Sequence, residues 1–94
     1  MSLKFEWDAK KAVSNKRKHD VTFEEASTVL SDLLTITILD PLRSGNEKRL
    51  VTIGRSDKHR VLVVVHTERE ELIRLISARP ATAHEKKRYE EGHG

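Results

Sequence analysis

The sequence contains no cysteine and few aromatic residues, and both absences narrow what the chain can be. Without cysteine there is no disulfide framework and no thiolate metal site, which suits a reducing cytoplasm, where we expect the protein to reside. One Trp and one Tyr argue against a stacking platform for single-stranded nucleic acid. No apolar run approaches the roughly 18 residues of a membrane-spanning helix, so we expect no membrane association.

Sequence motifs for cofactors and metals are missing as well. There is no Gly-rich phosphate loop and no paired-glycine dinucleotide fingerprint. The five histidines have neither cysteine partners nor an i, i+4 spacing, which makes a weak set of metal ligands. We therefore predict that the protein uses no cofactor and no metal.

The charged residues that are present have an uneven distribution. They make up 35% of the chain, yet the net charge is only +3. Residues 1–20 carry six basic and three acidic groups, residues 21–42 no basic and four acidic groups, and residues 43–60 six basic and two acidic groups. The two basic blocks favour binding of a polyanion such as RNA or DNA. On charge alone, an ordinary solvated surface explains them equally well.

The first half of the chain has the residue pattern of helices. A short strand is predicted at residues 4–7, followed by a helix that Asp8 caps and that runs through Lys18 with Ala12 and Val13 facing inward. Asp20 is expected to end this helix in a left-handed conformation. Capping-box spacing from Thr22 predicts a second helix, which extends to about residue 30.

The second half alternates between polar and apolar residues, as strands do. Four strands are predicted at residues 34–38, 49–55, 61–65 and 72–79, forming an antiparallel meander with 61–65 as a central strand and 68–71 as a turn. Pro80 should stop the last strand, and a second capping box from Thr82 should begin a C-terminal helix. The whole chain, residues 1–94, is therefore predicted to be a single α+β domain.

Residues able to cleave RNA without a metal are present near the predicted strand ends. Such cleavage needs a base for the 2′-hydroxyl, cations for the charged phosphorane and an acid for the leaving 5′-oxygen. Arginine binds phosphate through its planar fork, and histidine exchanges protons near neutral pH. The candidates are Arg55, His66, Arg74 and Arg79, with Tyr89 on the last helix.

Each candidate also has a structural explanation. Arg55 and Arg74 can simply pair with carboxylates, whereas His66 and Tyr89 can belong to the core. Arg79 has no obvious acid nearby in the sequence, which makes it the strongest candidate. Strand parity places Arg74 and Arg79 on opposite faces, unless a bulge re-aims one of them.

Three blocks of the chain resemble the BrnT family of toxins. The first block is Phe5-Glu6-Trp7-Asp8, Lys11, Asn15, Lys18-His19, Val21, Phe23 and Glu25-Ala26; the second is Arg49, Ile53-Gly54 and Val64-Val65-His66-Thr67-Glu68-Arg69; the third is Ile73-Arg74, Ile76-Ser77-Ala78-Arg79, Ala81-Thr82, Glu85 and Tyr89-Glu90. The chain departs from the family pattern at Asp20 and His59, where glycine is common. Both are turn positions, which Asp and His can occupy at modest cost.

The resemblance implies a RelE-like fold and a ribonuclease toxin of a bacterial type II toxin–antitoxin pair. It implies that the toxin inhibits translation and that a co-encoded antitoxin neutralises it in a hetero-oligomer, with 2:2 as one stoichiometry, which binds operator DNA through the antitoxin. On this reading Arg79 and Arg74 would grip or polarise phosphate, His66 would be a proton-transfer group and Tyr89 a positioning residue. Further RNA contacts are expected from Arg55, Arg49, Lys18 and His19.

Two other functions remain open from the sequence. One is a non-catalytic, toxin-like subunit of a DNA-binding repressor complex, which the small number of acid–base groups favours. The other is a structural interaction protein with a basic face. Cleavage of RNA by the isolated chain would distinguish the ribonuclease toxin from both of these alternatives.

Overall fold

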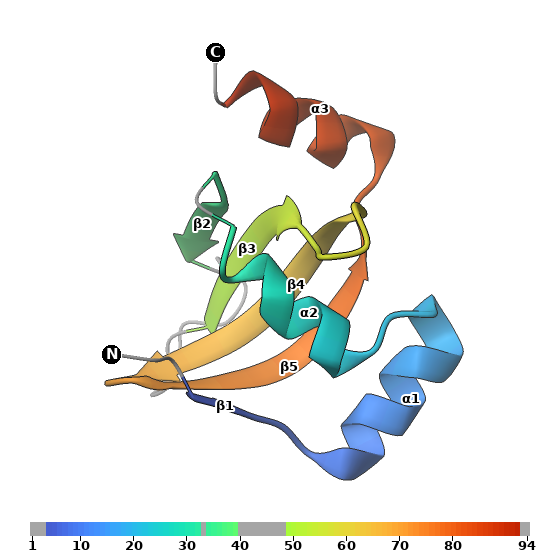
Figure 1. Cartoon of the computed structure of the whole chain (residues 1–94), viewed down its shortest axis with the longest axis vertical. Coiled ribbons are helices and arrows are strands. Elements are labelled where there is room, and N and C mark those ends of the chain that lie inside the picture. The colour runs from blue at the N-terminus through green and yellow to red at the C-terminus, as the bar shows by residue number, and fades with distance from the viewer. Residues whose placement is uncertain (1–3, 33, 40–48, 93–94) are drawn as a thin grey trace.

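The fold is one mixed sheet flanked by helices. The computed structural model describes residues 4–32, 34–39 and 49–92. In chain order the elements are β1 (Lys4–Glu6), α1 (Ala9–His19), α2 (Phe23–Val29), β2 (Ile36–Leu39), β3 (Arg49–Arg55), β4 (Val61–Arg69), β5 (Leu72–Pro80) and α3 (Ala83–Glu91) (Figure 1). The strand order is β1-β5-β4-β3-β2. β2 to β5 form an antiparallel meander and β1 pairs parallel with β5, so the predicted α+β class and element order are confirmed.

Most of the predicted helix signals act as expected. The Asp8 side chain accepts hydrogen bonds from the first backbone N–H groups of α1, and Asp20 ends this helix with a φ of 57°. Thr82 and Glu85 form a complete capping box at the start of α3. These contacts satisfy backbone groups that a helix end would otherwise leave without partners.

The capping box predicted at α2 forms only in half, because its glutamate has another partner. Thr22 accepts a hydrogen bond from the backbone N–H of Glu25. The Glu25 carboxylate, however, accepts from Arg60 Nε at 2.9 Å and from the Ser56 hydroxyl at 2.7 Å. The hydrogen bond from Arg60 holds the pKa of buried Glu25 below its usual value. This cluster fastens the β3–β4 turn to α2.

Two local predictions were wrong. Val13 is 60% exposed rather than inward, because α1 meets the rest of the fold through Ala12 and Asn15, and Val13 lies on another side of the helix. The turn predicted at 68–71 is shorter, since β4 and β5 stay paired as far as Arg69 opposite Leu72. Only two residues connect these strands, and Glu70 takes the positive φ of 56° that so tight a turn needs.

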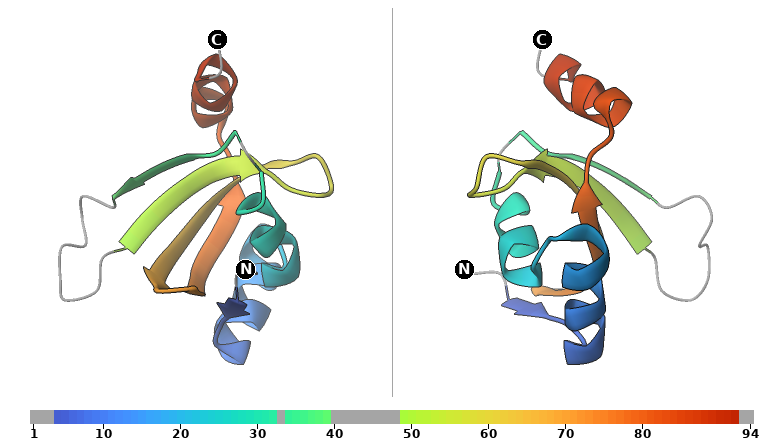
Figure 2. Two further views of the ribbon diagram at one scale, coloured as in Figure 1. Left: turned by 60° about the vertical axis from the view of Figure 1, so that its left-hand side comes forward. Right: turned by 90° about the vertical axis from the view of Figure 1, so that its right-hand side faces the viewer.

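The two faces of the sheet have different covers. We call the face under α1 and α2 the closed face (Figure 2). Its core consists of Val21, Phe23, Ala26, Val29, Leu62, Val64, Ile73, Leu75 and Ala78. The opposite side, which we call the open face, meets α3 at one end, where Tyr89 packs with Ile53, Val61 and Val63. None of the described helices lies over the rest of the open face. None of them is long and apolar enough to span a membrane.

A side chain takes the place of a strand at one edge of the sheet. Within the described residues, β1 pairs with residues 72–74 of β5. Further along β5, buried Asn15 of α1 donates to the Ala78 carbonyl at 2.8 Å and accepts from the Ala78 N–H at 3.0 Å. These two bonds reproduce the contacts of a neighbouring strand and fix α1 against the β5 edge.

Candidate functional site

A bulge in β5 decides which face its arginines share. Val65 pairs with Ser77 and the next β4 residue, His66, pairs with Leu75, so Ile76 has no partner on β4. The extra residue reverses the alternation beyond it. Arg74 lies opposite Thr67 and Arg79 opposite Val63, which both belong to the open face. The bulge that the parity argument required is present, and the two arginines share one face.

Four arginines gather on the open face, and we call Arg49, Arg55, Arg74 and Arg79 the arginine face. Arg49 and Arg74 flank Thr67 from the two neighbouring strands. Arg55 pairs with Val61 at the other end of β3, near the row that contains Arg79. In the sequence Arg49 precedes Arg79 by 30 positions and Arg55 precedes it by 24, so it is strand register that brings them together.

Arg79 has a carboxylate partner that the sequence prediction did not identify. Its two terminal nitrogens donate to the two oxygens of Glu85, each at 2.8 Å. This hydrogen-bonded pair, with the bond from Thr82, lowers the pKa of Glu85 to about 2 and raises the pKa of Arg79. Glu85 is six residues away and on α3, where the capping box aims it back at the strand end. The expectation that Arg79 has no nearby acid was therefore wrong.

The other arginines differ in their partners. Arg74 donates to Glu6 of β1 at 3.0 Å, in a pair of which both side chains are about half exposed. Among the described residues, neither Arg49 nor Arg55 takes part in an ion pair. Within the described part of the chain, the arginine face thus combines two guanidinium groups that form ion pairs and two that form none, all within reach of solvent.

His66 lies on the other side of the sheet from the arginines. It is 1% exposed on the closed face, and its Nε2 is 2.8 Å from the Thr52 hydroxyl. Thr52 is in turn 2.8 Å from the Thr37 hydroxyl, so a polar chain crosses β4, β3 and β2. His66 Nδ1 is buried without a partner among the described residues, and burial lowers the pKa of the ring. The structure does not bring His66 together with the arginine face.

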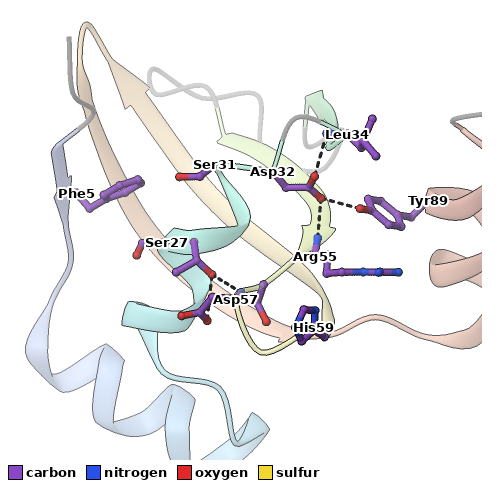
Figure 3. A pocket seen from close by; sticks show the side chains of 11 residues that line it. Phe5, Ser27, Ser31, Asp32, Leu34, Arg55, Asp57, His59 and Tyr89 are labelled. Atoms are coloured by element: carbon purple, nitrogen blue, oxygen red, sulfur yellow. Dashed lines mark hydrogen bonds between the residues drawn. The ribbon is translucent and has the colours of Figure 1, made fainter.

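Tyr89 is anchored at the rim of an open depression of about 650 Å³ (Figure 3). Its hydroxyl donates to Asp32 Oδ2 at 2.7 Å, and the same oxygen accepts from the backbone N–H of Arg55 at 3.0 Å. Burial and this hydrogen bond raise the pKa of Tyr89. Asp32 therefore ties α3 to the end of β3. Its position just after α2 gave no signal in the sequence.

Lys18 and His19 lie apart from the four arginines but beside the same strand. They line a small depression of about 200 Å³ between α1 and the bulged part of β5, together with Lys11, Ser14, Asn15, Ile76 and Ser77. We call this depression the α1 notch. Within the described chain, no group of three His, Asp or Glu side chains is placed to hold a metal ion.

Comparison with known proteins agrees with the fold and the motifs. The sequence model of the family described as "Ribonuclease toxin, BrnT, of type II toxin-antitoxin system" matches residues 7–85. Among solved structures, the chain is similar to the ribonuclease toxin BrnT of Brucella abortus, at 24% identity and a TM-score of 0.63. The likeness covers 86% of this chain and 99% of that one, and it concerns the fold. No curated protein matches the sequence.

Proposed function

Since this chain belongs to the BrnT family of ribonuclease toxins of type II toxin–antitoxin systems, we propose that it cleaves RNA without a metal ion and so inhibits translation. Membership of the family implies an RNA target and an antitoxin partner. The observation that carries the proposal is the arginine face, four cations from two strands on the side of the sheet that α3 covers only at one end.

The chemistry proposed for this face is attack by the 2′-oxygen of RNA on the adjacent phosphorus. The new P–O2′ bond forms, the P–O5′ bond breaks, and the products are a 2′,3′-cyclic phosphate and a 5′-hydroxyl. The proton of the 2′-hydroxyl goes to a base and the 5′-oxygen receives a proton. Arg79 and Arg74 would stabilise the charge that develops on the phosphoryl oxygens, which is the main electrostatic demand of this step.

The other predicted residues take supporting roles in this proposal. Arg49 and Arg55 would hold flanking phosphates through charge-assisted hydrogen bonds. Tyr89 would position α3, and with it Glu85, because its hydroxyl is bound to Asp32. A phosphate that reaches Arg79 must share its fork with Glu85 or replace that carboxylate. His66 is left out of the proton transfers because it is buried on the closed face.

The test is incubation of purified, antitoxin-free protein with RNA in the presence and absence of excess EDTA. We expect equal cleavage in both samples, with fragments that end in 2′,3′-cyclic phosphate. Activity that EDTA abolishes and magnesium restores would contradict the metal-independent mechanism while leaving the protein a ribonuclease.

A second candidate is a non-catalytic subunit of a DNA-binding repressor complex, and one observation favours it. The described strand residues of the open face include no histidine, and Arg74 and Arg79 already bind carboxylates. Under this alternative the purified chain leaves RNA intact with or without metal, yet still joins its antitoxin on operator DNA.

The antitoxin is proposed to cover the open face. Val51 and Val65 lie side by side there and are only partly buried, so an apolar antitoxin segment would gain by packing on them. Acidic groups of that segment would meet Arg49 and Arg55, whose side chains have no ion pair in the described chain. RNA and antitoxin should then compete, which a titration of the complex with non-cleavable RNA would measure; a stable ternary complex would contradict this arrangement.

A further inference from the structure

Helix α1 carries an unusual surplus of positive charge. Its sequence AKKAVSNKRKH contains five Lys or Arg residues and no acidic residue. One of the five, Lys16, pairs with Asp20 at the end of the helix. The other four, together with His19, have no ion pair within the described chain. A helix of this kind raises the local concentration of polyanions around it.

In the α1 notch, basic side chains of α1 lie beside residues of β5. Lys11 and Lys18 are seven residues apart, so both project from the same side of α1. They line the depression with the hydroxyl-bearing residues Ser14 and Ser77. No carboxylate is among the lining residues, so an anion entering the notch meets cations and neutral donors only.

The notch is continuous with the arginine face. Ser77 lines the notch, and it also lies between Arg74 and Arg79 on the open face of β5. Because β1 ends opposite Arg74, the β5 edge beyond it is flanked by α1 rather than by another strand. A nucleic-acid backbone that passes from the arginine face over this edge meets Ser77 and a notch lining without carboxylates. The carboxylates beside this route, Glu6 and Glu85, are paired with Arg74 and Arg79.

We propose that the RNA backbone runs from the arginine face across the β5 edge into the α1 notch, where Lys11 and Lys18 bind phosphates of the same strand. This inference rests on the proposed function, since it extends the footprint of the same substrate. It assigns to α1 a binding role away from the reacting bond, and it predicts a preference for RNA that is long enough to reach both places.

Two double variants with the same loss of charge test the proposal. Lys11→Gln with Lys18→Gln removes the cations of the notch. Lys10→Gln with Arg17→Gln removes two cations from the same helix, at exposed positions that do not line the notch. The probe is a 2′-O-methyl RNA of about a dozen nucleotides, which cannot be cleaved because the attacking hydroxyl is blocked. Thermal melting of all proteins would check that they fold equally.

We expect the notch variant to bind this RNA roughly 10- to 25-fold more weakly at about 0.1 M salt, and its slope of log K against log salt to become about 1.4 shallower. The matched control should change both quantities far less. Equal effects of the two variants, or no effect of either, would overturn the inference while leaving the arginine face as the RNA site. Failure of the wild-type protein to bind RNA would overturn the proposed function itself and the inference with it.

Discussion

The closed and open faces of the same sheet differ in the type and the burial of their side chains. On the closed face, the core strand residues are aliphatic and buried, and the polar residues His66, Thr52 and Thr37 form a chain of hydrogen bonds. On the open face, arginines alternate with partly buried aliphatic residues, and the carboxylates that bind two of them come from β1 and α3. The closed face is covered by α1 and α2, whereas the open face keeps charge where solvent and ligands can reach it.

This difference separates stability from binding within a very small protein. In this chain of 94 residues the larger of the two buried clusters lies on the closed face, and the smaller one lies on the open face beneath α3. Substitutions in the larger cluster should act on the free energy of unfolding and leave the chemistry of folded molecules intact. Substitutions of the open-face arginines should do the reverse, and three experiments measure how cleanly the two properties divide.

The largest effect is expected from Phe23→Ala on the closed face. Phe23 is fully buried and contacts the edge of Trp7, with ring centroids 5.8 Å apart. Loss of the ring should lower the free energy of unfolding by about 3–5 kcal/mol. Urea denaturation measures this loss, and cleavage per folded molecule should stay within about twofold under conditions where the variant is folded. A large loss of activity in fully folded protein would show that the two faces are coupled.

A smaller free-energy effect, but a larger effect on activity, is expected from Arg79→Ala on the open face. Removal of one preorganised donor to the developing charge should slow RNA cleavage roughly 100-fold or more. The melting temperature should fall by only a few degrees, because the pair with Glu85 is partly exposed. Arg79→Lys is the matched control, which keeps the charge but loses the fork. Activity that survives while the melting temperature collapses would make Arg79 a structural residue.

The smallest effects are expected in the pH dependence of stability, where one group from each side of the sheet, His66 and Glu85, acts in its own pH range. Burial lowers the pKa of His66 below 6.5, so the unfolded chain binds this proton first, and stability should fall as the pH drops below about 7. Glu85, with a pKa of about 2 against the usual 4.5, stabilises the fold fully above about pH 5 and loses that contribution as the pH falls toward 2. Because the pair with Arg79 is partly exposed, Glu85 contributes only about 1 kcal/mol to the free energy of unfolding.

Urea midpoints measured from pH 8 to pH 2 would resolve the two windows. His66→Gln should flatten the fall that begins below about pH 7, and Glu85→Gln should flatten the dependence only below about pH 5. If His66→Gln leaves the upper window unchanged, the ring is not the group that titrates there.

The fold was predictable from sequence because its signals are local. Helix caps at Asp8 and Thr82, the αL position at Asp20 and the alternation of the strands all depend on residues a few positions apart. His59, the second departure from the family pattern, also has the positive φ of 64° expected for a turn. The turn at 68–71 and the orientation of Val13 were wrong, and the capping box at α2 forms only in half; all three depend on how far pairing or packing extends in three dimensions.

The candidate site was predictable in residue type but not in arrangement. Arginines near strand ends stood out, yet their grouping depends on strand register and on one unpaired residue, Ile76. Glu85 was expected to act only as a helix cap, although it does this and binds Arg79 at the same time. The depth of His66 in the core could not be inferred, because an apolar strand that ends in histidine is compatible with either face. The roles of all these residues in RNA cleavage stay predictions.

The bulge at Ile76 also limits how this protein can change during evolution. Deletion of a single residue there would turn Ala78 out of the core and carry Arg79 to the side occupied by α1 and α2. Point substitutions in β5 alter one side chain, but a change of length would exchange the two surfaces of everything that follows. Among relatives that keep the arginine face, we therefore expect this strand to vary in composition and not in length.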